Sequence, residues 1–250
     1  MTNSMNVVFV QGINTAYRGA YDTVEGLLEP IQVRFFYTTR EEPLPKALER
    51  LVCLLKSADA ILAHSLGAVY LRLACELWRP QVPIVLTNAV VNPRAQLGLF
   101  ARSPVALLKA ARDALAGARS LLHSLGIPGL SPRALYAPTC LFLAEPFTYL
   151  EERRWPAWRE WLGGNHFGIN VEQVLDVLLR ADALANGGAL WRGYDIRVIL
   201  GADDDTTPLG RVLEVESPSR ILSLRCRHEP FNDSRGVQQA WAAAVKDCLT

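Results

Sequence analysis

The stretch Asp59-Ala60-Ile61-Leu62-Ala63-His64-Ser65-Leu66-Gly67-Ala68-Val69-Tyr70 indicates the fold of this 250-residue chain. It opens with an apolar run typical of a buried strand and ends in a segment with helical spacing. Ser65 therefore stands at a sharp turn from strand to helix, between the small residues Ala63 and Gly67. This is the G-x-S-x-G arrangement of a nucleophilic serine, with Ala in place of the first Gly. The alternative is that Ser65 only caps the helix, whose first N–H groups lack intrahelical acceptors.

Two segments further along the chain favour a nucleophilic role of Ser65 over a helix cap. The strand-like run 195–200 leads into the acidic turn Gly201-Ala202-Asp203-Asp204-Asp205-Thr206-Thr207-Pro208. The strand-like run 220–227 leads into His228, whose imidazole, with an ordinary pKa of about 6.5, can take a serine proton at neutral pH. Serine, acid and histidine thus follow one another along the chain, each at the end of a strand.

This order and placement resemble the α/β-hydrolases over nearly the whole chain, with no subfamily identified. The resemblance implies an α/β fold with a mostly parallel sheet and helices on both faces. The family commonly shows Gly-x-x-Asp-x-x-x-Pro after the strand that carries the acid, and Gly201, Asp204 and Pro208 match it. Asp204 is therefore the preferred acid. Asp203 and Asp205 are the alternatives, and otherwise they are solvated turn carboxylates.

The remaining histidines are less well placed to act as the base. His64 directly precedes the nucleophile and should point away from it. His123 and His166 fall in a less recognisable insertion, where a surface or helix-face position is expected. Some family members carry the acid at the end of the strand that corresponds to the apolar run 84–91, but Asn88 and Asn92 cannot ionise there, which favours Asp204.

Backbone donors for an oxyanion are expected from two turns. The first strand-like run ends in Gln11-Gly12-Ile13, where the family usually shows His-Gly. The chemistry needs a backbone N–H here, not the histidine side chain. Gly12 and Ile13 are therefore the candidates on this turn, and Leu66 is the candidate after the serine. Gln11 stands where the family usually has histidine, and we expect this difference to affect the substrate preference more than the hydrolytic mechanism.

Alternating patterns predict the rest of the organisation. Strands are expected near 6–11, 31–38, 59–64, 82–91, 195–200 and 220–227, and helices over 21–28, 44–56, 68–78 and 237–249. Residues 1–93 and 191–250 would form the α/β-hydrolase core domain, and 94–190 a mainly helical cap or lid.

Two helices and an aromatic segment are expected within that cap. Leu108, Leu115 and Leu122 recur at heptad spacing in the first helix, and 171–184 is the second. The segment 155–168 is rich in tryptophan and glycine. It is either a mobile lid with an apolar acyl pocket or the cap's own small core with helix-ending glycines.

The composition and charge of the chain limit the kinds of partner that we expect it to bind. The formal net charge is +1, so no basic field for nucleic acid is present. No apolar stretch approaches the roughly 20 residues of a membrane span, and the N-terminus does not resemble a secretory signal. The cysteines stand singly without C-x-x-C spacing, which predicts reduced thiols in a cytoplasmic protein and no metal site. They are Cys53, Cys75, Cys140, Cys226 and Cys248. No cofactor is expected.

These features predict a carboxylesterase-like serine hydrolase acting on a small or medium hydrophobic acyl substrate. Ser65, Asp204 and His228 would form the triad, and Leu66, Ile13 and Gly12 would line the oxyanion hole. A thioesterase, lipase-like enzyme, amidase, acyltransferase or C–C hydrolase would use the same triad. Epoxide or haloalkane chemistry is disfavoured because the elbow carries Ser and not Asp. The alternative from another class is a non-catalytic hydrolase-fold module that binds a ligand or a protein.

Overall fold

The computed structural model of the protein describes residues 5–12, 21–38, 42–96, 171–186, 189–204, 207 and 218–249. Within these ranges, six strands form one sheet in the order β2-β1-β3-β4-β5-β6, and every neighbouring pair is parallel. The strands are β1 Asn6–Val10, β2 Gln32–Phe36, β3 Ala60–Ser65, β4 Ile84–Ala89, β5 Ile196–Gly201 and β6 Arg220–Leu224. The expected α/β class with a mostly parallel sheet is confirmed.

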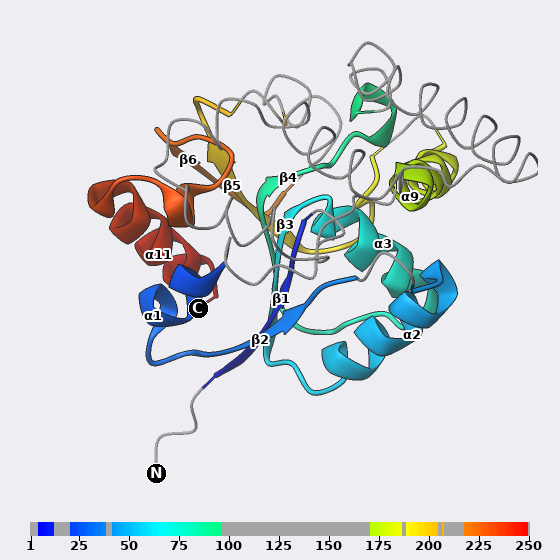
Figure 1. Ribbon diagram of the computed structural model, residues 1–250, viewed down its shortest axis with the longest axis horizontal. Helices are drawn as coiled ribbons and strands as arrows, with labels where there is room; N and C mark the ends of the chain where they lie inside the picture. Colours follow the sequence, from blue (N-terminus) through cyan, green and yellow to red (C-terminus); the bar gives the residue numbers. More distant parts are fainter. Residues whose placement is uncertain are drawn as a thin grey trace, which may run out of the picture.

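Helices cover both faces of this sheet (Figure 1). On one face lie α1 Asp22–Leu28 and α11 Arg235–Leu249, and on the other lie α2 Leu44–Leu55, α3 Gly67–Leu77 and α9 Val171–Ala185. Side chains alternate along β1, since successive strand residues point to opposite faces. Val7 and Phe9 pack toward α11, and Val8 and Val10 pack toward α3. Two buried cores result, one on each face.

The predicted elements are present, with shifts at their ends. The fourth strand ends at Ala89 and not at residue 91, and the last helix begins at Arg235, two residues earlier than expected. The 3₁₀ turn η2, Pro230–Asn232, has no counterpart among the predictions. The helix predicted at 171–184 is α9, which packs against α3 in one core.

The other cap predictions, the heptad helix near Leu108 and the aromatic segment 155–168, lie outside the described residues. The division into a core domain and a cap at 94–190 therefore stays a prediction.

The strand order has a reversal that positions the site. From β1 the chain moves outward to β2, and it then returns to the other side of β1 to form β3. In open parallel sheets, ligands bind beyond the carboxyl ends of the strands where such a reversal occurs. Gly12 follows β1 and Ser65 ends β3, so both lie at this position.

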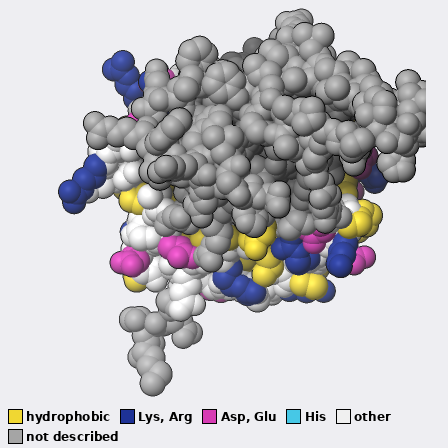
Figure 2. Space-filling model, in the orientation of Figure 1, with side chains coloured by type: hydrophobic (Ala, Val, Ile, Leu, Met, Phe, Trp, Pro, Cys, Tyr) yellow, Lys and Arg dark blue, Asp and Glu magenta, His cyan; other side chains and the backbone are white. Residues whose placement is uncertain are grey.

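The described surface has mixed charge. On the face shown in Figure 2, Lys and Arg side chains lie among Asp, Glu and apolar side chains. Among the helices of the described ranges, none combines the length and the apolarity needed to cross a membrane. The four cysteines in these ranges are free thiols: Cys53 is exposed, whereas Cys75, Cys226 and Cys248 are buried.

Candidate active site

Ser65 occupies a strained turn between β3 and α3. Its φ is 53°, in the left-handed region that residues other than glycine rarely adopt. The N-cap position of α3 is Leu66, and no side chain caps this helix end. Ser65 therefore does not serve as the helix cap that the sequence left open as an alternative.

Glycines allow two other backbone segments to approach this turn. A Cβ at Gly67 would lie 2.2 Å from the carbonyl oxygen of Val10, and a Cβ at Gly12 would lie 2.7 Å from Cβ of Ser65. Side chains do not fit at such distances. The end of β1 and the start of α3 thus meet at the serine because both positions are glycine.

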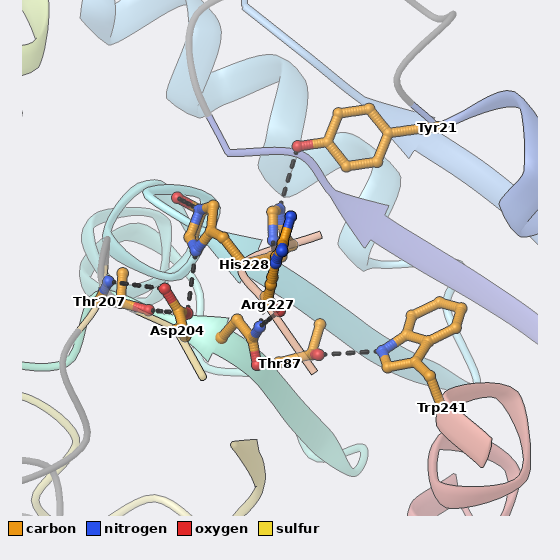
Figure 3. A network of polar contacts seen from close by, with 10 residues as sticks. Tyr21, Thr87, Asp204, Thr207, Arg227, His228 and Trp241 are labelled. Atoms are coloured by element: carbon orange, nitrogen blue, oxygen red, sulfur yellow. Dashed lines mark hydrogen bonds and ion pairs between the residues drawn. The ribbon is translucent and has the colours of Figure 1, made fainter. Parts of the chain in front are cut away.

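Ser65, His228 and Asp204 form one hydrogen-bonded chain. The distance from Ser65 Oγ to His228 Nε2 is 2.9 Å, and that from His228 Nδ1 to Asp204 Oδ2 is 3.0 Å. All three residues are buried, with exposed fractions of 5%, 2% and 7%. Since an ionised carboxylate only accepts hydrogen bonds, His228 Nδ1 carries the proton, and Nε2 is free to accept the serine hydroxyl. Figure 3 shows His228 beside Asp204.

Thr207 holds the Asp204 carboxylate in place. Its backbone N–H donates to Oδ1 at 3.1 Å, and its hydroxyl donates to Oδ2 at 2.6 Å. Burial by itself would raise the pKa of Asp204, but the hydrogen bonds from His228 and Thr207 outweigh it and lower the pKa below its ordinary value. The carboxylate is therefore ionised at neutral pH.

Of the two alternative acids, Asp203 and Asp205, the structure describes the first. Asp203 is half exposed and faces the guanidinium of Arg225 at 3.7 Å. Asp205 lies outside the described residues. Among the carboxylates of the acidic turn that the structure describes, only Asp204 reaches His228.

The structure describes two of the three residues predicted to donate a backbone N–H to the oxyanion. Leu66 directly follows Ser65 at the start of α3. Gly12 lies against Ser65, but its N–H donates to the hydroxyl of Tyr21 at 3.2 Å. Ile13 lies outside the described residues.

His64 lies beside the candidate base. Its Nε2 is 2.9 Å from the carbonyl oxygen of His228, its Nδ1 is 3.1 Å from the hydroxyl of Tyr21, and the centres of the two imidazole rings are 4.8 Å apart. Burial and the nearby His228 lower the pKa of His64 to about 4. His64 is therefore neutral, with Nε2 as the donor to the carbonyl and Nδ1 as the acceptor from Tyr21.

Protonation of His64 predicts a pH dependence of stability. Below about pH 6.5 the unfolded chain binds a proton at this residue, whereas the folded chain binds it only near pH 4. The free energy of unfolding should therefore fall as the pH drops from 6.5 to 4, by about 3 kcal/mol from this residue. Urea unfolding of the wild type and of His64→Phe across this range measures it, because the variant lacks this contribution.

The carboxylate of Asp204 does not obscure that measurement. Its lowered pKa contributes stability that is lost only at more acid pH, as the pH falls through its folded pKa. Equal pH slopes for the wild type and His64→Phe between pH 6.5 and 4 would contradict a buried neutral His64.

Several contributing residues were not predicted from the sequence. Thr207 is the one with a readable signal, because it follows Asp204 by three residues, a spacing at which the carboxylate of a turn accepts a nearby backbone N–H. Tyr21 was expected only as the start of a helix, and Asn88 only as a residue that cannot ionise. The amide of Asn88 donates to the carbonyl oxygens of Arg227 and His228, at 2.7 and 3.0 Å.

A group of side chains that could bind a metal ion is absent from the described residues. Among the described residues, no three His, Cys, Asp or Glu side chains are grouped so that they could hold a metal ion.

Solved structures resemble this one over almost the whole chain. An extracellular α/β-hydrolase from a Paenibacillus species, described as sharing structural and functional homology with tobacco salicylic acid binding protein 2, superposes with a TM-score of 0.56 at 12% identity and covers 98% of both chains. A hydrolase from Pseudomonas aeruginosa gives 0.56 at 16% identity, with 100% of this chain and 91% of the other covered. An epoxide hydrolase of the α/β-hydrolase superfamily from hot-environment metagenomes gives 0.57 at 17%, covering 100% and 92%.

No known family model matches the sequence, and no curated protein matches it significantly. At these low identities the structural likeness establishes the fold, which is that of the α/β-hydrolases.

Proposed function

With the α/β-hydrolase fold as the premise, we propose that the protein is a serine hydrolase that cleaves an ester-type acyl bond. The observation that carries the proposal is the buried chain of hydrogen bonds from Ser65 Oγ through His228 to Asp204, at 2.9 and 3.0 Å. Nucleophile, base and orienting acid stand in the order and within the distances that acyl transfer requires.

In the proposed reaction, His228 Nε2 takes the hydroxyl proton as Ser65 Oγ attacks the acyl carbonyl. The negative charge that develops on the carbonyl oxygen is stabilised by backbone N–H groups, for which Leu66 and Ile13 are the candidates. Gly12 is the weaker candidate, since Tyr21 accepts its N–H.

Collapse of the tetrahedral intermediate completes the cycle. His228 returns the proton to the leaving group, and Ser65 keeps the acyl group as an ester. Water, activated by the same imidazole, then releases the acid. Asp204 stays ionised throughout and fixes the imidazole in the tautomer with the proton on Nδ1.

A carboxylesterase-like activity on small or medium hydrophobic acyl groups is our first choice, because the segment 155–161 holds three tryptophans suited to an apolar pocket. One structural neighbour is described as an epoxide hydrolase, but a serine at the elbow suits acyl transfer better than epoxide opening. Free thiols in the described ranges suit a reducing compartment, so we expect the protein in the cytoplasm.

Labelling with a fluorophosphonate tests the proposal, because this reagent phosphonylates only an activated serine. We expect intact mass spectrometry to show one adduct per chain, and peptide mapping to place it on Ser65. His228→Ala should label at least about 10²-fold more slowly, since the hydroxyl loses its base.

Two outcomes would contradict a serine hydrolase. An adduct on another serine would refute the assignment of Ser65. A folded wild type that takes up no label would favour the alternative of a non-catalytic binding module.

A further inference from the structure

One backbone oxygen near the triad accepts two buried hydrogen bonds. The carbonyl oxygen of His228 lies 2.9 Å from Nε2 of His64 and 3.0 Å from Nδ2 of Asn88. A carbonyl has two lone pairs, so both are used. The two donors come from the ends of the adjacent central strands β3 and β4, whereas His228 stands in a segment without helix or strand. Two central strands of the sheet thus hold a segment that lies outside the helices and strands.

A β-bulge aims the Asn88 side chain. In the register of β3 and β4, His64 pairs with Thr87 and Ser65 pairs with Ala89, so Asn88 is the extra residue. Its φ is 43°, a left-handed conformation that asparagine tolerates better than most residues. Bulges beside active sites often redirect a side chain, and here the amide points to the segment that carries the base.

The contacts of His64 extend to the other side of the nucleophile. The hydroxyl of Tyr21 donates to Nδ1 of His64 and accepts the N–H of Gly12. One path of hydrogen bonds therefore joins the turn after β1, the residue before the nucleophile, and the backbone of the base. All the polar side chains on this path are buried.

We propose that His64 and Asn88 are positioning residues that clamp the backbone carbonyl of His228, so that its imidazole stays within hydrogen-bonding distance of Ser65. This role rests on the proposed serine hydrolase activity. Neither side chain touches the serine hydroxyl among the described contacts, so both act through His228. A misplacement of a catalytic group by about 1 Å can cost about 10²-fold in rate, which makes the backbone position of the base worth fixing.

The test uses substitutions that remove the donors and keep the local shape. Asn88→Gly retains the left-handed backbone and loses the amide, and His64→Phe keeps a ring against Tyr21 and His228 and loses both nitrogens. We expect each to lower kcat and the fluorophosphonate labelling rate together, by about 10- to 100-fold, with KM within about threefold of the wild type. His64→Gln, whose amide can still donate, should retain more activity than His64→Phe.

Thr87→Val is the matched control. The hydroxyl of Thr87 is buried beside Asn88 and accepts a hydrogen bond from Trp241 Nε1 at 3.0 Å, without contacting the triad in the described structure. It should lower the thermal midpoint and leave the labelling rate unchanged. If His64→Phe and Asn88→Gly fold and label at the wild-type rate, the clamp is refuted and these residues only pack.

A second measurement separates the clamp from the proposed activity and does not need a folded variant. In the wild type, nitrogen NMR of the histidine rings should show His64 neutral with its proton on Nε2, and the proton on His228 Nδ1 should resonate far downfield. A His64 protonated on Nδ1 would overturn the clamp even if the enzyme is active. A wild type that is not labelled but shows the expected His64 tautomer would refute the activity alone.

Discussion

Ser65→Ala is expected to lower kcat for the hydrolysis of acyl esters by about 10⁶-fold, to near the background rate. The variant removes the only atom that forms the acyl bond and leaves the base and the acid in place. Initial rates with a series of p-nitrophenyl esters of increasing chain length measure the loss and, in the wild type, the acyl preference.

The fold should not suffer from this change, because Oγ of Ser65 contacts only His228 among the described hydrogen bonds. Urea unfolding is the control, and we expect a free energy of unfolding close to that of the wild type. Turnover by Ser65→Ala at even a tenth of the wild-type rate would mean that another group performs the chemistry.

Asp204→Asn is expected to lower kcat by about 10⁴-fold with little change in KM. The amide keeps the size of the side chain, but its nitrogen can donate where the carboxylate only accepts. The imidazole of His228 would then carry its proton on Nε2, the atom that must take the proton of Ser65. Steady-state kinetics with the preferred ester, at several pH values, measures the effect.

Asp203→Asn is the matched control in the same turn. Its carboxylate is half exposed and faces Arg225, so removal of its charge should change kcat by less than about twofold. If Asp203→Asn is the inactive variant and Asp204→Asn is not, the assignment of the acid is wrong.

The central part of the fold could be predicted because its signals are local. Short apolar runs separated by helical spacing are typical of parallel strands, and each predicted run overlaps one strand of the sheet. The residues proposed for the triad were found for the same reason, since each follows such a run and the carboxyl ends of parallel strands share one edge. To expect these three residues at one edge of the sheet, it is enough to know that the strands are parallel and where each of them ends.

The supporting residues could not be predicted because they depend on tertiary register. The role of Asn88 depends on one extra residue in β4 relative to β3, and sequence patterns locate strand ends only to within a few residues. His64 was expected to point away from the nucleophile because it directly precedes it, but the segment of His228 returns to lie against the ring of His64. Neither the extra residue in β4 nor the return of the His228 segment can be predicted from the order of residues along the chain.

The proposed mechanism also makes the reactivity of Ser65 depend on how much of the chain has been synthesised. Ser65 and its turn stand in the first third of the chain, whereas the base follows β6, the edge strand at the far end of the sheet and the last to be translated among those described. β1, β2 and β3 are synthesised long before residue 228 leaves the ribosome. In the proposed mechanism the hydroxyl of Ser65 remains an ordinary alcohol until then, so we expect no serine hydrolase activity before the C-terminal segment docks.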